Sequence, residues 1–229
     1  MNTFLASFLF PHFCVGCFRP GVVICEACIR KGVMHSPQRC LWCGGPSFLG
    51  LTHEKCKNHT KVNGIYSFFY YQPPLRQVIK SSKYRHNKAI LYDLLSLLPL
   101  KMIFSLWRLK DIYPDPIATY VPQTPDVFRE RGFNQSQVIA QHLATALRVP
   151  LYGIFEKLHT TKHQSQLPKQ VRRTNLSQVF GLKINKNLHN ILLIDDVVTT
   201  GSTVNELARV IKQHNPSSMV YVISVFRAS

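Results

Sequence analysis

The segment ILLIDDVVTTGSTV, residues 191–204, carries the most information about the architecture of the chain. It opens with four apolar residues in succession, a pattern typical of a strand buried on both faces of a parallel sheet. Gly201 permits a tight turn, and the residues from Gly201 to Gln213 have helical spacing. A buried strand followed at once by a helix predicts an α/β domain with a mainly parallel sheet.

The chain beyond about residue 62 alternates between strand-like and helix-like segments. Further strands are predicted at residues 65–71, 117–122 and 219–226, and further helices at residues 75–84, 89–98 and 135–147, the last capped by Asn134. Two polar segments, VFRERGFNQSQ and HTTKHQSQLPKQVRRTN, are predicted to be functional loops. We therefore expect a small module at residues 1–62 and an α/β domain with flanking helices at residues 63–229.

The chain is strongly basic. It has 28 Lys and Arg residues against 11 Asp and Glu residues, a formal charge of +17. This charge favours anionic partners such as nucleic acid, phosphorylated metabolites or acidic lipid. A basic surface that serves only solubility is the alternative that charge alone leaves open.

The sequence contains no apolar run of the length, about 20 residues, that a transmembrane helix needs. Its first residues, MNTFLASFLFPHF, have no Lys or Arg ahead of a short apolar segment that Pro11 interrupts. This composition does not fit a secretory signal, so we expect a cytoplasmic protein.

All seven cysteines lie near the amino end of the sequence. They form CVGC (Cys14, Cys17), CEAC (Cys25, Cys28) and CLWC (Cys40, Cys43), with Cys56 left over. Three C-x2-C pairs have the spacing of zinc knuckles, in which two thiolates on a tight turn reach one tetrahedral Zn²⁺. A disulfide framework is the alternative, but it belongs to secreted proteins and would leave one thiol unpaired.

A histidine next to Cys56 would complete eight ligands for two zinc ions. His53 in HEKC and His59 in CKNH have the same spacing from Cys56, and the compact loop from Cys43 favours His53. Sequential pairing would place Cys14, Cys17, Cys25 and Cys28 on one ion, and Cys40, Cys43, His53 and Cys56 on the other. Interleaved pairing stays open. Closed sites with four protein ligands have a structural role, holding together a module too small to fold by burial alone.

The segment after the apolar run predicts an anion site. Ligands of parallel α/β sheets bind beyond the carboxyl ends of the strands, which is where Asp195 and Asp196 stand. The amides around Gly201 and the hydroxyls of Thr199, Thr200, Ser202 and Thr203 can donate to a phosphate at the start of a helix. The lysine-containing G-x-x-x-x-G-K-[ST] motif of nucleoside triphosphatases does not occur. Two carboxylates beside a phosphate site suit sugar hydroxyls and Mg²⁺, so the pattern predicts a ribose phosphate as the ligand.

These residues resemble a known signature. ILLIDDVVTTGST is similar to the motif with which type I phosphoribosyltransferases bind 5-phosphoribosyl-1-pyrophosphate (PRPP). The rest of the chain resembles the ComF family of competence-associated phosphoribosyltransferase-like proteins, through CGGP, PPLRQVIKSSKY, RERGFNQSQVIAQHLA and the spaced Gln164, Leu167, Arg172 and Asn175 before Phe180. That family usually has a C-x2-C pair where HEKC stands here, which supports His53 over His59.

The resemblance implies a type I phosphoribosyltransferase fold preceded by a double zinc-ribbon-like module. It implies PRPP contacts from Asp195, Asp196, Val198, Thr199, Thr200, Gly201, Ser202, Thr203 and Lys83, with Mg²⁺ on the pyrophosphate. Lys83, in SSKY, would on its own be taken for a surface lysine. Phosphoribosyl transfer needs no protein nucleophile, and none is assigned.

Two polar clusters would border the acceptor by analogy with the family. They consist of Arg129, Arg131, Asn134 and Gln135, and of Arg172, Arg173 and Asn175. For any one of these residues, a solvated loop on a basic protein explains the sequence nearly as well. No individual role is assigned to them.

Two functions of different classes are compatible with the sequence. One is an enzyme that transfers ribose 5-phosphate from PRPP to an unknown acceptor. The other is a non-catalytic factor of natural transformation, which would bind single-stranded DNA, work with the DNA-uptake machinery and bind PRPP only as a regulator or vestige. An intact phosphate site indicates binding, and binding alone does not distinguish the two.

Overall fold

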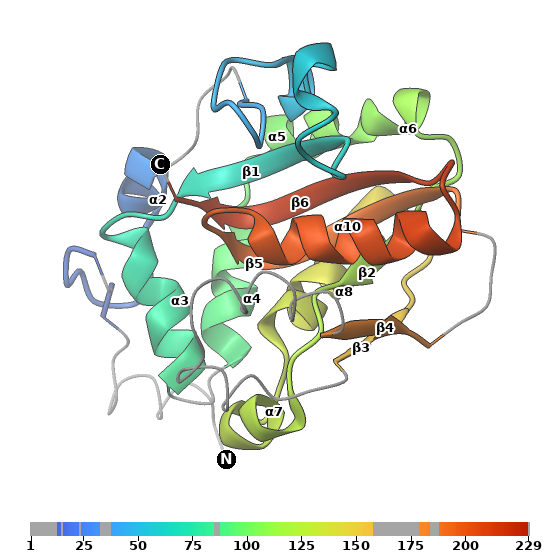
Figure 1. The fold of residues 1–229 in the computed structure, drawn as a ribbon. Coiled ribbons are helices and arrows are strands. Elements are labelled where there is room, and N and C mark those ends of the chain that lie inside the picture. Colours follow the sequence, from blue (N-terminus) through green and yellow to red (C-terminus); the bar gives the residue numbers. More distant parts are fainter. Residues whose placement is uncertain are drawn as a thin grey trace, which may run out of the picture.

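The structure is a computed structural model of the chain, and it describes residues 13–14, 16–22, 24–32, 38–84, 88–157, 179–183 and 188–228. A four-stranded sheet forms its centre (Figure 1). The strands are β1 (Gly64–Tyr70), β2 (Ile117–Tyr120), β5 (Asn190–Val198) and β6 (Met219–Arg227). Their order is β1-β6-β5-β2, and every pair is parallel. The predicted α/β class with a parallel sheet is therefore confirmed.

Both faces of the sheet are covered because successive strand residues point to opposite sides. In β5, Leu192 and Ile194 join the core on one face, whereas Ile191 and Leu193 join the core on the other. The second face is covered by α10 (Ser202–His214), which lies in front of the sheet in Figure 1. This double burial explains why the strand is apolar without interruption.

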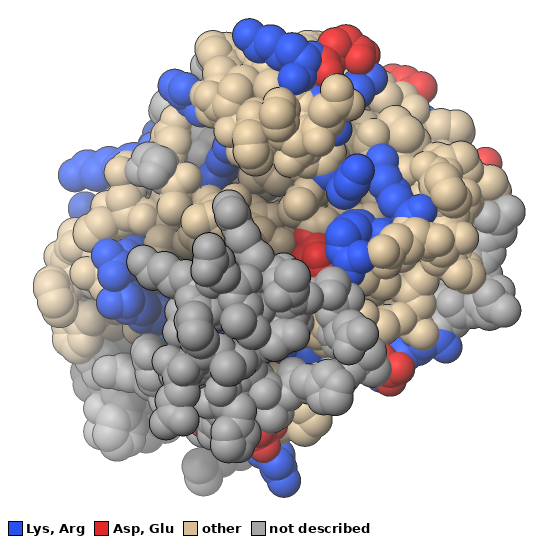
Figure 2. Space-filling view, in the orientation of Figure 1, with Lys and Arg blue, Asp and Glu red and all other residues tan. Residues whose placement is uncertain are grey.

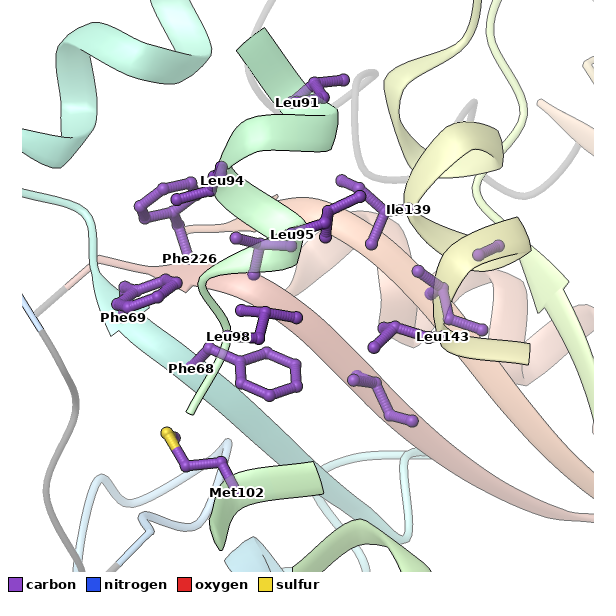
Figure 3. Close-up of a cluster of buried hydrophobic side chains, with 14 of the residues drawn as sticks. Phe68, Phe69, Leu91, Leu94, Leu95, Leu98, Met102, Ile139, Leu143 and Phe226 are labelled. Atoms are coloured by element: carbon purple, nitrogen blue, oxygen red, sulfur yellow. The ribbon is translucent and has the colours of Figure 1, made fainter. Parts of the chain in front are cut away.

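The other face carries the larger core. It is covered by α3 (Leu75–Tyr84), α4 (Lys88–Ser96), α5 (Leu100–Trp107) and α8 (Gln135–Leu147). Phe68 and Phe69 of β1 and Phe226 of β6 are fully buried there, among leucines of α4 and α8 (Figure 3). These large side chains hold the helices on the sheet and so fix the positions at which its loops begin.

Several short elements were not predicted. They are α5, α6 (Leu109–Ile112), α7 (Pro125–Arg131) and the antiparallel pair β3 (Phe155–Lys157) and β4 (Phe180–Leu182). The loop predicted for VFRERGFNQSQ is therefore wrong in its first half. Thr124 caps α7, since its Oγ1 accepts a hydrogen bond from Val127 N at 3.3 Å, and Pro125 occupies the first turn where no amide is needed.

The cysteine-rich part contains α2 (Glu26–Gly32) and the 3-10 turns η1 (Phe48–Gly50) and η2 (Glu54–Cys56). It packs on the sheet through long-range hydrogen bonds. Gln38 Nε2 donates to Ser67 O at 3.1 Å, and Ser67 N donates back to Gln38 Oε1 at 2.9 Å. The Tyr221 hydroxyl donates to Leu49 O. Residues 38–62 are thus held against β1 and β6.

In the part of the chain that the structure describes, no single helix is long and apolar enough to cross a membrane. Lys88–Ser96 and Leu100–Ile112 reach the required length and composition only as a pair, and that pair is bent by 82°. Residues 1–12, on which the signal-peptide argument rests, lie outside the described residues.

Candidate functional site

The site is built around the end of β5, which is longer than predicted. Asp195 and Asp196 lie within the strand, which runs to Val198 instead of ending at Ile194. The reason is that β6 continues beside it and pairs Asp195 with Ser224 and Val198 with Arg227. On the other edge, β2 stops at Tyr120, opposite Ile194. Asp195 and Asp196 therefore lie beyond the last residue of β5 that pairs with β2.

Asp195 is buried, with 8% of its surface exposed, and its carboxylate is held in place. Its Oδ1 accepts hydrogen bonds from Ser136 Oγ at 3.0 Å and from Asp196 N at 2.9 Å. Burial raises the pKa of Asp195 well above its usual range, the neighbouring Asp196 carboxylate adds to this, and the Ser136 hydroxyl opposes it. The half-buried Asp196 accepts from Val197 N at 2.8 Å. The pair offers several oxygen acceptors to a ligand with hydroxyl groups.

The loop after β5, residues 199–203, turns the chain from the strand into α10. Gly201 adopts a left-handed conformation with φ 76°, which allows the chain to turn into α10 at Ser202. Gly201 is buried, whereas Thr199, Thr200, Ser202 and Thr203 are exposed. A glycine at this position supplies no side-chain cap to α10. The exposed hydroxyls thus lie at the positive end of the α10 dipole, where a bound anion would be stabilised.

The start of α8 reaches Asp195 through Ser136. Asn134 Oδ1 caps the helix by accepting from Gln137 N at 3.3 Å, and Asn134 Nδ2 donates to Val121 O at 2.9 Å. This cap sets the helical phase that directs Ser136 toward Asp195. Ser136 was missed by the sequence reasoning. Its only sequence signal is its place in the first turn of a helix that follows a strand neighbouring β5.

A buried amide pair lies beside this helix start. Gln123 Nε2 donates to Gln135 Oε1 at 2.6 Å, and Arg131 also reaches Gln135 Oε1 at 3.4 Å. Within the described residues, Gln123 Oε1 and Gln135 Nε2 are buried without a hydrogen-bond partner. Of the first predicted polar cluster, the structure thus brings Arg131 and Gln135 into contact, and Arg129 and Asn134 line one cavity. Buried amide atoms without a partner are costly, and a ligand or water would satisfy them.

A cavity of about 500 Å³ opens next to Asn134, between α7, α8 and the β3–β4 pair. Its basic lining comes from Arg129, Lys157 and Lys183, and aromatic rings of Tyr120, Phe128 and Phe155 complete it. Burial lowers the pKa of Lys157. A cavity of this volume and lining suits a planar or anionic group.

Other predicted site residues lie outside what the structure describes. Lys83 falls in the last turn of α3, but its side chain is not described. Arg172, Arg173 and Asn175 belong to residues 158–178, which are not described. Their roles stay predictions.

Two groups of side chains could each hold a metal ion. They are Cys14, Cys17, Cys25 and Cys28, and Cys40, Cys43, His53 and Cys56, and in each group the ligand atoms lie within 4.8 Å of one another. This grouping is the sequential one, and it includes His53. His59 instead stacks on Trp42, with ring centroids 4.8 Å apart.

The donor chemistry of both groups fits a tetrahedral metal such as zinc. Burial raises the pKa of Cys14, but hydrogen bonds from backbone amides outweigh it and lower that pKa to about 6. The same balance lowers the pKa of Cys40 to about 7. His53 Nε2 lies 3.0 Å from Pro46 O, so it can donate there and leave Nδ1, which is 3.3 Å from Cys43 Sγ, free to bind a metal.

Comparisons with known proteins agree with this geometry. The family model "Phosphoribosyl transferase domain" matches residues 134–229, which include α8, β5 and α10. The DNA utilization protein YhgH of Salmonella typhi is 28% identical over 198 residues, 86% of each chain. The YhgH protein of Shigella flexneri is 30% identical over 150 residues, 65% of this chain and 66% of that protein. Competence protein ComFC of Bacillus subtilis is 24% identical over 220 residues, 92% of this chain and 86% of its own.

Among solved structures, a purine phosphoribosyltransferase from Pyrococcus horikoshii Ot3 is 19% identical, with a TM-score of 0.35, over 55% of this chain and 80% of that chain. A likeness at that TM-score adds no weight to the assignment of the fold. The family model, the parallel sheet with its flanking helices and the named relatives together carry it. The chain belongs to the ComF family of phosphoribosyltransferase-like proteins.

Proposed function

We propose that this protein binds PRPP at the junction of β5 and α10. The 5-phosphate would lie on the loop from Thr199 to Thr203, and the ribose hydroxyls would donate to Asp195 and Asp196. One observation carries the proposal: a buried and a half-buried carboxylate, Asp195 and Asp196, are followed within a few residues by a left-handed glycine and a helix start without a side-chain cap. A ligand with a diol and a terminal phosphate matches both parts.

We further propose transfer of the ribose 5-phosphate group to an acceptor. The reaction needs position and charge stabilisation more than a nucleophile, because positive charge develops on the sugar as pyrophosphate leaves. Ser136 would keep the Asp195 carboxylate oriented toward the sugar. The cavity with Arg129, Lys157 and Lys183 is the place we assign to the acceptor. Mg²⁺ bound with PRPP would neutralise the pyrophosphate, and the oxygen donors of the aspartate pair fit such a hard cation.

The test is isothermal titration calorimetry of PRPP in the presence of Mg²⁺. The double variant Asp195→Asn/Asp196→Asn should bind PRPP about tenfold or more weakly, because hydrogen bonds to two charged acceptors are weakened. Asp111→Asn is the matched control, since Asp111 is exposed on α6, away from the site. Equal affinity in the wild type and the double variant would refute the site. Release of pyrophosphate from labelled PRPP with candidate acceptors then tests transfer separately from binding.

The two cysteine groups would hold structural zinc ions, two per chain. Each group offers four protein ligands and so leaves no place for a reactive water in a tetrahedral site. Metal analysis of the purified protein should give two zinc ions per chain, and one or none would contradict the proposal.

A second function is favoured by the charge. The formal charge of the chain is +17, and in Figure 2 Lys and Arg occur at several separate places on the described surface, with acidic side chains beside some of them. The relatives named for competence and DNA utilization point in the same direction. We propose that the protein also binds single-stranded DNA during DNA uptake in the cytoplasm, with the uptake machinery as a partner.

A further inference from the structure

Residues 38–62 contain the second group of metal ligands, and they contact the PRPP loop at its centre. Leu41, which lies between the ligands Cys40 and Cys43, rests directly on Gly201. A Cβ atom added to Gly201 would lie 2.8 Å from Leu41 Cδ1 and 3.1 Å from Leu41 Cδ2. The Leu41 side chain can approach the backbone of residue 201 this closely because a glycine has no Cβ. The loop tip is therefore in close contact with a side chain of the metal-binding unit.

A second contact is made after the loop, in the first turn of α10. Asn205 Oδ1 accepts hydrogen bonds from Thr60 Oγ1 at 2.8 Å and from Lys61 N at 2.6 Å. Asn205 N in turn donates to Gly201 O at 2.9 Å. This chain of bonds connects the end of the metal-binding unit to the start of the helix that carries the loop.

A third contact is made before the loop, at the end of β5. Arg227 of β6 pairs with Val198, and Ala228 N donates to Val198 O at 2.9 Å. The Arg227 guanidinium is buried and donates to Arg39 O at 2.7 Å and to Cys40 O at 3.0 Å. The carbonyl of a metal ligand is thus connected through the Arg227 side chain to β6, whose last residue pairs with the end of β5 from which the loop begins.

We infer that residues 38–62 position the PRPP loop, so that occupancy of the second metal group controls the affinity for PRPP. The inference rests on the proposed function. Leu41, Asn205 and Arg227 are the positioning residues, one for each part of the loop. The first metal group is the natural comparison, because the described contacts of its residues reach α3 and Pro74 and not the loop.

The physical reason is that a small metal-binding unit depends on its ion for a defined fold. With the ion, Cys40 and Cys43 fix the knuckle that carries Leu41. Without it, the unit loses its cross-link, and the order that it imposes on the loop is lost with it. PRPP would then have to order the loop itself, which lowers its apparent affinity.

The experiment compares two matched variants, Cys43→Ala and Cys17→Ala. Each removes the exposed thiol of one group, so each should lower the zinc content from two ions to one. Only Cys43→Ala should weaken PRPP binding, by about tenfold or more, and increase amide hydrogen exchange at residues 199–205. Equal PRPP affinity in the two variants, or unchanged exchange at the loop, would overturn the inference.

A second pair of variants removes the contact while leaving all metal ligands in place. Leu41→Ala should retain two zinc ions, weaken PRPP binding and loosen the loop, whereas Leu41→Ile should restore the affinity because it restores the volume against Gly201. If Leu41→Ala acted only by destabilising the whole protein, Leu41→Ile would not be expected to restore PRPP affinity in particular. Wild-type affinity for PRPP in Leu41→Ala with an unchanged loop would contradict the positioning role.

Linkage adds a reciprocal test. If the second metal ion raises the affinity for PRPP, then PRPP must raise the affinity for that ion by the same factor. PRPP should therefore slow chelator-driven loss of zinc from the Cys17→Ala variant, which keeps only the second group, and leave loss from Cys43→Ala unchanged. Hydrogen exchange of the loop with and without zinc needs no PRPP. A wild type that fails to bind PRPP but shows zinc-dependent loop exchange would refute the proposed function alone.

Discussion

Gly201 combines a left-handed backbone conformation with a close contact to Leu41. It has φ 76°, which an L side chain rarely adopts, and its missing Cβ leaves room for Leu41. Gly201→Ala should lower the free energy of unfolding by more than the roughly 1–2 kcal/mol of the backbone term, and it should weaken PRPP binding. Gly21→Ala is the control, since Gly21 has φ 93° with no atom within 4 Å of the added Cβ.

Denaturant unfolding and calorimetry measure both effects. The double variant Leu41→Ala/Gly201→Ala should recover part of the stability that the glycine variant loses, because the clash with Leu41 is removed. Equal losses for Gly201→Ala and Gly21→Ala would show that the contact with Leu41 has no energetic weight.

Asp195 gives a pH dependence with a defined sign. Its pKa is raised by burial and by Asp196, so it takes up a proton at a higher pH than an ordinary aspartate. The ionised form accepts hydrogen bonds from ribose hydroxyls better than the protonated form. PRPP affinity should therefore fall as pH is lowered through the raised pKa and recover as pH rises.

The Asp195→Asn variant separates this effect from protonation of PRPP itself. Both proteins experience the titration of the ligand phosphates, but only the wild type titrates at position 195. The difference between their PRPP affinities should shrink toward acidic pH in calorimetric titrations. A difference that is constant over the whole pH range would argue against a titrating Asp195 in the site.

At the scale of elements, the start of α8 links the segment after β2 to Asp195 in β5. Asn134 caps it and also bonds to Val121 O, and Ser136 in its first turn reaches Asp195. Asn134→Ala should cost roughly 1–2 kcal/mol of unfolding free energy in denaturant titrations, because a cap and a buried acceptor lose their partners. Asn134→Ser keeps a capping oxygen and should lose less. An equal loss in both variants would mean that the cap is not what stabilises α8.

The elements also show where local patterns were sufficient. The helix capped by Asn134 and the helix after Gly201 were predicted within a residue or two, because caps and helical periodicity are local signals. β5 was predicted too short, because its extension through Asp195 and Asp196 depends on pairing with β6. α7 was predicted as a loop, because its apolar periodicity is weak and only Thr124 and Pro125 mark its start.

At the scale of the whole molecule, the charge predicts how DNA would bind. A surface with a net charge of +17 would neutralise several phosphates and release their counterions. The logarithm of the affinity for a single-stranded oligonucleotide should therefore fall linearly and steeply with the logarithm of salt concentration. Fluorescence anisotropy measures this, with an uncharged methylphosphonate oligonucleotide of the same sequence as the control. Tight binding that ignores salt would rule out this electrostatic mode.

The sequence by itself determined the parallel α/β domain. It predicted the PRPP loop, and it favoured His53 over His59 as the eighth metal ligand. Each of these depends on spacing within a few residues, which the chain order already contains. Tertiary structure decided which groups meet across the fold. Ser136 reaches Asp195 over 59 residues, and Thr60 reaches Asn205 over 145. Packing of the metal-binding unit on the loop through Leu41 and Arg227 is likewise long-range. Such contacts depend on how sheet and module pack, and no local periodicity encodes them.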